Sequence, residues 1–208
     1  MLRLALAAVL LSIAAPAHAD GKHASCYDEL ESRHVGFKKT HRPGIAQAVE
    51  IVGALGGVEV TGRTPLVIDC SLAVSLDEAG RYMRALGIVK ATFASAYSRR
   101  NVRFTNHPSK HSYGLAIDVS GFSGPDVGSM RVTRDFEQGL GDAIDCVGRP
   151  LTQAGAVLKV LQCQLVRSGL FDLVLSPDYD DAHHDHYHLQ VKPWRERAEL
   201  RASTPAIH

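Results

Sequence analysis

The chain has 208 residues, 45% of them hydrophobic, and its 23 lysines and arginines nearly balance its 22 aspartates and glutamates. A net charge of +1 gives no basic excess of the kind that nucleic-acid-binding proteins carry, so we expect no nucleic acid partner. The length suits one domain that buries its own core.

The N-terminus has the pattern of a secretory signal peptide over residues 1–19. Arg3 supplies a positive start, Leu4 to Ala15 is apolar, and Ala17-His18-Ala19 is a small-x-small cleavage site. We expect cleavage before Asp20 and a protein located in the periplasm or outside the cell. The apolar run is shorter than the roughly 18 residues needed to cross a bilayer. No later stretch reaches that length, so no membrane span is expected after cleavage.

Apolar spacing and turn residues predict a mixture of helices and short strands. The first half is expected to hold an irregular, extended segment at 20–43, a helix at 45–55, strands at 58–60 and 66–68, and a helix at 76–96 that starts at Ser75. The second half adds strands at 102–105 and 115–119, a loop at 120–128, helices at 136–145 and 152–167, strands at 173–175 and 187–191, and a charged tail at 192–208.

These elements follow one another without a regular βαβ rhythm, which favours an α+β fold over a doubly wound sheet. We expect a small antiparallel sheet that carries a zinc site, with helices packed on one side of it. The folded domain is predicted to span 20–191. We expect the protein to be a monomer.

The four cysteines are Cys26, Cys70, Cys146 and Cys163. An even number in an exported chain predicts two disulfides, for which three pairings exist. Pairing between sequence neighbours favours Cys26–Cys70 and Cys146–Cys163. None of them forms a C-x-x-C pair, so a cysteine-based zinc site is not expected.

Two polar segments stand out as parts of a divided metal site. If 115–119 is a strand, Asp118 lies on the face opposite Leu115, Ile117 and Val119. Gly114 permits a turn that brings His111 back toward Asp118.

The second segment has the same logic, because His186 and His188 alternate with Tyr187 and Leu189. Laying this strand beside 115–119 would bring His188 to Asp118. Two histidines and a carboxylate leave an open coordination position, which is typical of catalytic zinc. The alternative is a histidine-rich surface tract at 183–188 that scavenges metal without a defined function.

The motif Ser109-x-His111-x-x-Gly114-x-Ala116-x-Asp118, followed by His186-x-His188, resembles the signature of the LAS group of zinc peptidases. That group includes D-alanyl-D-alanine carboxypeptidases, murein endopeptidases and the Hedgehog signalling domain. The match is closer to the extensin-like C-terminal domain, which the segments 70–73, 109–122, 175–179 and 183–188 resemble. The resemblance spans about residues 26–191. One departure, Ser98 where a cysteine beside the arginine is expected, leaves the disulfide pairing open.

The resemblance implies a role for each matching residue. His111, Asp118 and His188 would bind one zinc ion per chain. His186 would contact the transition-state oxygen, and Arg100, or else Arg99, would neutralise its charge. The general base would be Asp185 or His183.

The expected function is therefore hydrolysis of peptide or amide bonds by a secreted zinc metallopeptidase of the carboxypeptidase or endopeptidase type. The expected substrate is peptidoglycan or another cell-wall peptide. The alternatives are a non-catalytic zinc-containing module that binds the cell wall and a zinc-storage protein.

Overall fold

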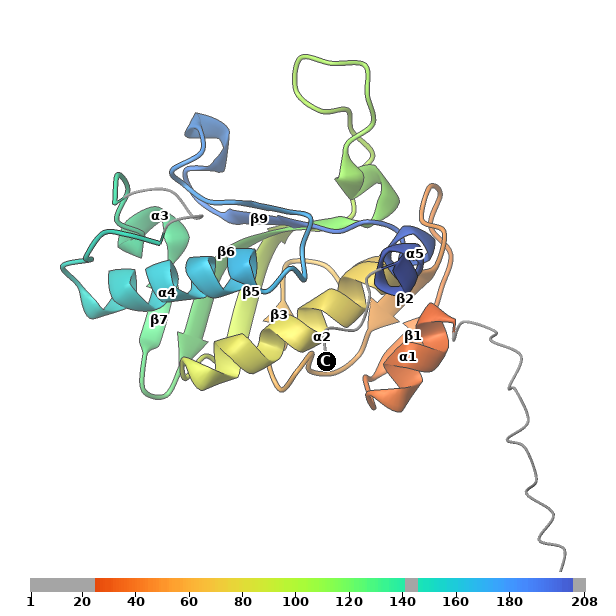
Figure 1. Cartoon of the computed structure of the whole chain (residues 1–208), viewed down its shortest axis with the longest axis horizontal. Coiled ribbons are helices and arrows are strands. Elements are labelled where there is room, and N and C mark those ends of the chain that lie inside the picture. The colour runs from red at the N-terminus through yellow and green to blue at the C-terminus, as the bar shows by residue number, and fades with distance from the viewer. Residues whose placement is uncertain (1–24, 141–145, 204–208) are drawn as a thin grey trace, which may run out of the picture.

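The computed structural model describes residues 25–140 and 146–203. It has mixed α and β structure, with two small sheets and helices packed against them (Figure 1). The signal peptide predicted at 1–19 lies outside the described residues. Within the residues described, no helix is long and apolar enough to cross a membrane.

The smaller sheet has the order β1-β2-β4, formed by Phe37–Lys39, Ala48–Ile51 and Val67–Asp69. The larger sheet has the order β3-β5-β6-β9-β8, and β7 also pairs with β6. Its strands are Glu59–Thr61 (β3), Lys90–Ser95 (β5), Ala116–Gly124 (β6), Gly128–Arg131 (β7), Leu173–Leu175 (β8) and Tyr187–Gln190 (β9). The β3–β5 pair is parallel and the other pairs are antiparallel, so this sheet is mixed.

The α-helices of the described chain are Cys26–Ser32 (α1), Cys70–Ala85 (α2), Val132–Asp135 (α3), Gln153–Arg167 (α4) and Trp194–Ser203 (α5). Helices α2 and α4 contact each other and lie on the same face of the larger sheet (Figure 1). The core between these layers contains Leu72, Ile117, Leu158 and Leu189, all fully buried. The opposite face of β6 and β9 is therefore left for polar side chains.

Both predicted disulfides are confirmed. Cys26–Cys70 ties α1 to the first residue of α2, and Cys146–Cys163 ties a loop to α4. Two disulfides are consistent with a secreted or extracellular protein.

One predicted helix is wrong, and another is confirmed with different bounds. Residues 45–55 contain strand β2, which is paired on both sides by β1 and β4. The helix predicted at 76–96 begins earlier, because the side chain of Asp69 accepts the backbone N–H of Ser71 at the N-terminus of α2. It ends at Ala85, two residues before Gly87, whose φ is +78°, and the chain then forms β5.

The loop predicted at 120–128 is also wrong, because β6 continues to Gly124 and turns back as β7. The glycines permit close packing here: a Cβ on Gly124 would collide with the carbonyl oxygen of Gly87.

Four further expectations differ from the structure. The segment at 20–43, predicted to be irregular, contains α1 and β1. The strand at 102–105 is a turn, and the tail at 192–208 contains α5. Residues 136–140 are not helical, and 141–145 lie outside the part of the chain that is described.

Candidate metal centre

His111 lies in a 3₁₀ turn, Lys110–Tyr113, that precedes β6. Ser109 caps this turn by accepting the backbone N–H of His111, and Gly114 ends it in the left-handed conformation with φ of 64°. The His111 ring is buried, and its Nδ1 lies 2.6 Å from the carbonyl oxygen of Ala96. The turn that the glycine allows therefore places the imidazole over β6, as the sequence predicts.

Asp118 and His188 lie directly opposite each other in the antiparallel β6–β9 pair. Their neighbours Ile117, Val119 and Leu189 point into the core and are buried. Alternation along both strands then puts the carboxylate and the imidazole together on the other face. The predicted pairing of these two segments is confirmed.

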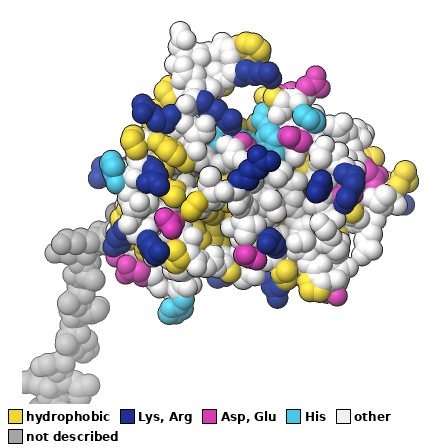
Figure 2. Space-filling model, turned by 180° about the vertical axis from the view of Figure 1, so that it is seen from behind, with side chains coloured by type: hydrophobic (Ala, Val, Ile, Leu, Met, Phe, Trp, Pro, Cys, Tyr) yellow, Lys and Arg dark blue, Asp and Glu magenta, His cyan; other side chains and the backbone are white. Residues whose placement is uncertain are grey.

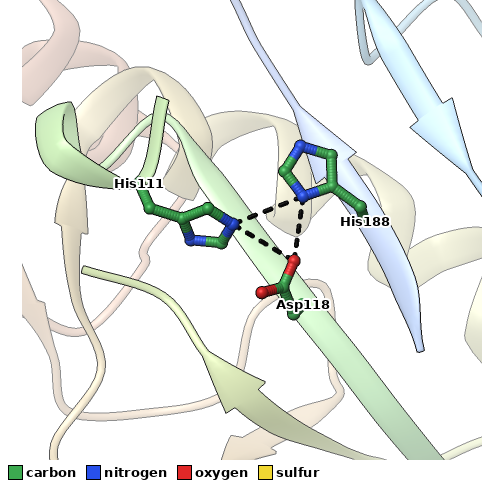
Figure 3. A group of neighbouring side chains, drawn as sticks. All are labelled: His111, Asp118 and His188. Atoms are coloured by element: carbon green, nitrogen blue, oxygen red, sulfur yellow. Dashed lines mark hydrogen bonds and ion pairs between the residues drawn. The ribbon is translucent and has the colours of Figure 1, made fainter. Parts of the chain in front are cut away.

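The three side chains converge on one point (Figure 3). Asp118 Oδ1 lies 2.9 Å from His188 Nδ1 and 3.2 Å from His111 Nε2, and the two ring nitrogens are 3.3 Å apart. Three ligands around tetrahedral zinc, at about 2.0–2.1 Å from it, would be about 3.3 Å from one another. The donor atoms are therefore spaced as a small divalent cation requires.

The hydrogen bond to Ala96 fixes which nitrogen of His111 carries the proton. A carbonyl oxygen only accepts, so Nδ1 is the donor and Nε2 of the neutral ring holds a lone pair. With both rings neutral, at most one proton, on His188 Nδ1, lies among the three converging atoms. Lone pairs in such contact repel each other unless a cation or a further proton lies between them. The Ala96 carbonyl behind His111 is also the kind of outer partner that metal-binding histidines usually have.

The charge around Asp118 also suits a cation ligand. Burial raises the pKa of its carboxyl group, but the neighbouring imidazoles of His111 and His188 outweigh burial and hold the pKa well below its usual range. Asp118 is therefore an anion at neutral pH. The guanidinium of Arg100 lies 3.3 Å from its Oδ2. Among the described residues, Arg99 forms no hydrogen bond or salt bridge with the site, so the structure brings Arg100 and not Arg99 to the cluster.

His186 extends the cluster on its more exposed side. Its Nε2 lies 3.4 Å from Asp118 Oδ1, and its Nδ1 lies 2.7 Å from Asp185 Oδ1. Strand β9 begins only at Tyr187. Asp185 and His186 precede it, so their side chains need not point to opposite faces of the sheet and can contact each other.

His183 lies over the same region from the 3₁₀ turn Asp181–His183. Its ring centroid is 5.2 Å from that of His186 and 5.8 Å from that of His188. Its Nδ1 is 2.6 Å from Asp180 Oδ1, so that carboxylate orients the ring and leaves Nε2 as the acceptor of the neutral form.

Two partners in this site were missed by sequence reasoning. Asp180 stands three residues before His183, a spacing that could have signalled the pair. Ala96 offers only a backbone carbonyl, for which the sequence holds no signal.

The chain matches the family model described as extensin-like protein C-terminus over residues 24–200, and it therefore belongs to that family. No curated protein and no solved structure matches it.

Proposed function

We propose that the chain is a zinc-dependent hydrolase of peptide or amide bonds, acting on cell-wall peptides in the periplasm or outside the cell. The observation that carries the proposal is the convergence of His111 Nε2, His188 Nδ1 and Asp118 Oδ1, with the His111 tautomer set by Ala96. The resemblance to LAS-type zinc peptidases, which rests on the sequence motifs, supplies the reaction class.

His111, Asp118 and His188 would hold the ion. When bound, zinc would lower the pKa of water to about 7 and polarise the scissile carbonyl. The protein's own contribution is to exclude competing protons: the buried His111 ring can offer only its Nε2 lone pair, and Asp118 stays ionised.

His183 is the proton acceptor that we favour over Asp185. The Asp180 carboxylate accepts the Nδ1 proton of His183 and so leaves Nε2 free to take a proton from water. The carboxylate of Asp185 is already engaged with His186 Nδ1 at 2.7 Å. In this arrangement Asp185 stabilises a protonated His186.

His186 and Arg100 would then stabilise the negative charge that develops on the carbonyl oxygen. A protonated His186 donates from Nε2, the nitrogen that faces Asp118. The Arg100 side chain is half exposed, and its single contact with Asp118 at 3.3 Å leaves it free to reach a substrate.

The first test is the metal content of the purified protein beside two variants. We expect one zinc per chain in the wild type, none in His188→Ala, and an unchanged content in the control His184→Ala. His184 is not one of the three converging residues, and its Nδ1 contacts the backbone carbonyl of Asp181. Several metals per chain, or loss in both variants, would instead indicate a histidine-rich scavenger.

Hydrolysis is tested on purified peptidoglycan and on soluble stem peptides. His183→Ala should keep its zinc and lose most activity, with a smaller loss in Asp185→Ala. Zinc retained by a wild type that cleaves neither substrate would overturn the hydrolase and favour the non-catalytic cell-wall module.

A further inference from the structure

Residues 101–108, which we name the arm, form a closed loop that projects beyond the sheets between β5 and the His111 turn (Figure 1). Hydrogen bonds cross its neck, from Val102 N–H to His107 O at 2.8 Å and from Ser109 N–H to Arg100 O at 2.9 Å. At its tip, Thr105 N–H donates to Val102 O at 3.0 Å. The arm is therefore held in one shape by its own backbone.

The tip of the arm presents an aromatic ring to solvent. Phe104 is 96% exposed and has a φ of 61°. A left-handed conformation is unfavourable for a bulky residue, and exposure of a phenyl ring returns no burial energy. Folding therefore gains no burial energy from this ring, and strain at an exposed position points to a binding role.

The arm and its base carry one sign of charge. Arg99, Arg100, Arg103 and Lys110 fall within twelve residues, and no aspartate or glutamate occurs from 99 to 113. Among the residues that the structure describes, Arg99, Arg103 and Lys110 form no salt bridge, and the Arg103 guanidinium lies 5.4 Å from the Phe104 ring centroid. An aromatic ring beside unpaired cations suits a ligand that carries carboxylates and apolar groups.

The base of the arm is joined to the metal centre. Arg100 contacts Asp118, and its backbone N–H donates to Ser112 Oγ, next to His111. On the other side, exposed Tyr179 lies edge-on to His183, 5.6 Å between centroids. Figure 2 shows histidine side chains in a hollow below the lobe at the top of the molecule, where Figure 1 places the arm.

We propose that the arm binds a carboxylate-bearing cell-wall peptide beside the bond that the site cleaves. Arg99 and Arg103 pair with carboxylates of the peptide, and Phe104 packs on its apolar groups. This inference rests on the proposed function for its choice of substrate. Under this proposal, residues that are not metal ligands recognise the part of the peptide next to the cleaved bond.

Binding can be measured apart from hydrolysis. The purified protein, with EDTA present, is sedimented with insoluble peptidoglycan and titrated with soluble anionic stem peptide. The test variant is Arg103→Gln/Phe104→Ala. The matched control is Arg149→Gln/Leu151→Ala, which also removes an exposed arginine and a nearby apolar side chain that is 94% exposed. Neither pair contributes to the core, so both variants should fold.

We expect about tenfold weaker binding for the test variant and less than a twofold change for the control. Equal binding by both variants would overturn the inference. Arm-dependent binding to polygalacturonate but not to stem peptide would overturn the choice of a peptide. If only the test variant lost binding but the wild type hydrolysed neither substrate, the role of the arm in peptide binding would stand and the proposed hydrolase activity would be refuted.

Discussion

Gly114 places His111, so replacing it with alanine should disturb both stability and metal binding. Its backbone is left-handed, and its carbonyl accepts the N–H of Asp69 at 2.9 Å. An added Cβ would lie 2.7 Å from Asp69 N and 2.7 Å from Ile45 Cδ1, closer than real Cβ atoms approach other atoms. The turn must therefore move if residue 114 is alanine.

The expected loss has two parts. A left-handed alanine costs about 1 kcal/mol relative to glycine, and displacing crowded neighbours costs about 1–3 kcal/mol more. Gly128 is a matched control, because its φ is +67° and nothing lies within 4 Å of an added Cβ. Gly114→Ala should therefore lose about 2–4 kcal/mol of unfolding free energy and Gly128→Ala about 1 kcal/mol.

Urea unfolding of the metal-free proteins measures these losses, and competition with a coloured chelator measures zinc affinity. A shifted His111 should weaken zinc binding about 10- to 100-fold in Gly114→Ala and leave it unchanged in Gly128→Ala. If the two variants lost equal stability and bound zinc equally well, the turn at 114 would not be what positions His111.

Three further predictions concern the scaffold. Asp69 accepts hydrogen bonds from Gln47 N–H and from both Ser71 N–H and Oγ–H, so Asp69→Ala should cost about 2–3 kcal/mol in urea unfolding. Ser25→Ala, which removes an exposed cap hydrogen bond to Asp28 N–H, should cost about 1 kcal/mol or less. Equal losses would contradict this account. The disulfide Cys26–Cys70 joins residues 44 positions apart, so Cys26→Ser/Cys70→Ser should lose about 3–4 kcal/mol of unfolding free energy in thermal or urea unfolding. A loss below about 1 kcal/mol would argue against a stabilising role for this disulfide. Hydrogen bonds from Leu151 N–H and from the hydroxyl and N–H of Thr152 lower the pKa of Glu137. Its contribution is therefore present above the ordinary glutamate pKa of about 4.3 and is lost as the pH falls. Glu137→Gln should accordingly flatten the stability curve below roughly pH 5, and an unchanged curve would refute the linkage.

The divided site could be predicted because strand alternation is a local rule with a long-range consequence. Once 115–119 and 187–191 are strands with one apolar face, Asp118 and His188 must share the other face, and only their register remains open. The structure supplies that register, Asp118 opposite His188. The turn at Gly114 could likewise be predicted, because few other residues tolerate its φ.

The errors arose where one pattern suits two structures. The apolar spacing of Ile45, Val49 and Val52 fits a helix face, but β2 is held by pairing with two strands that the local sequence does not reveal. The glycines after Asp118 suggest a loop, whereas Gly121 and Gly124 lie within β6, where they allow close backbone contact. Tertiary contacts decided both segments.

The exposure of the site residues indicates from which side a ligand enters. The exposed fraction of the side chain rises from 1% for His111 to 12% for His188 and 19% for His183. On the proposed function, a substrate would therefore approach over β9, where the candidate base lies, and the deeply buried His111 would serve only to hold the ion. The arm rises from the His111 turn on the other side, so a chain bound along it would have to cross the histidines to reach Tyr179. An extended peptide is therefore the ligand that we propose for that path.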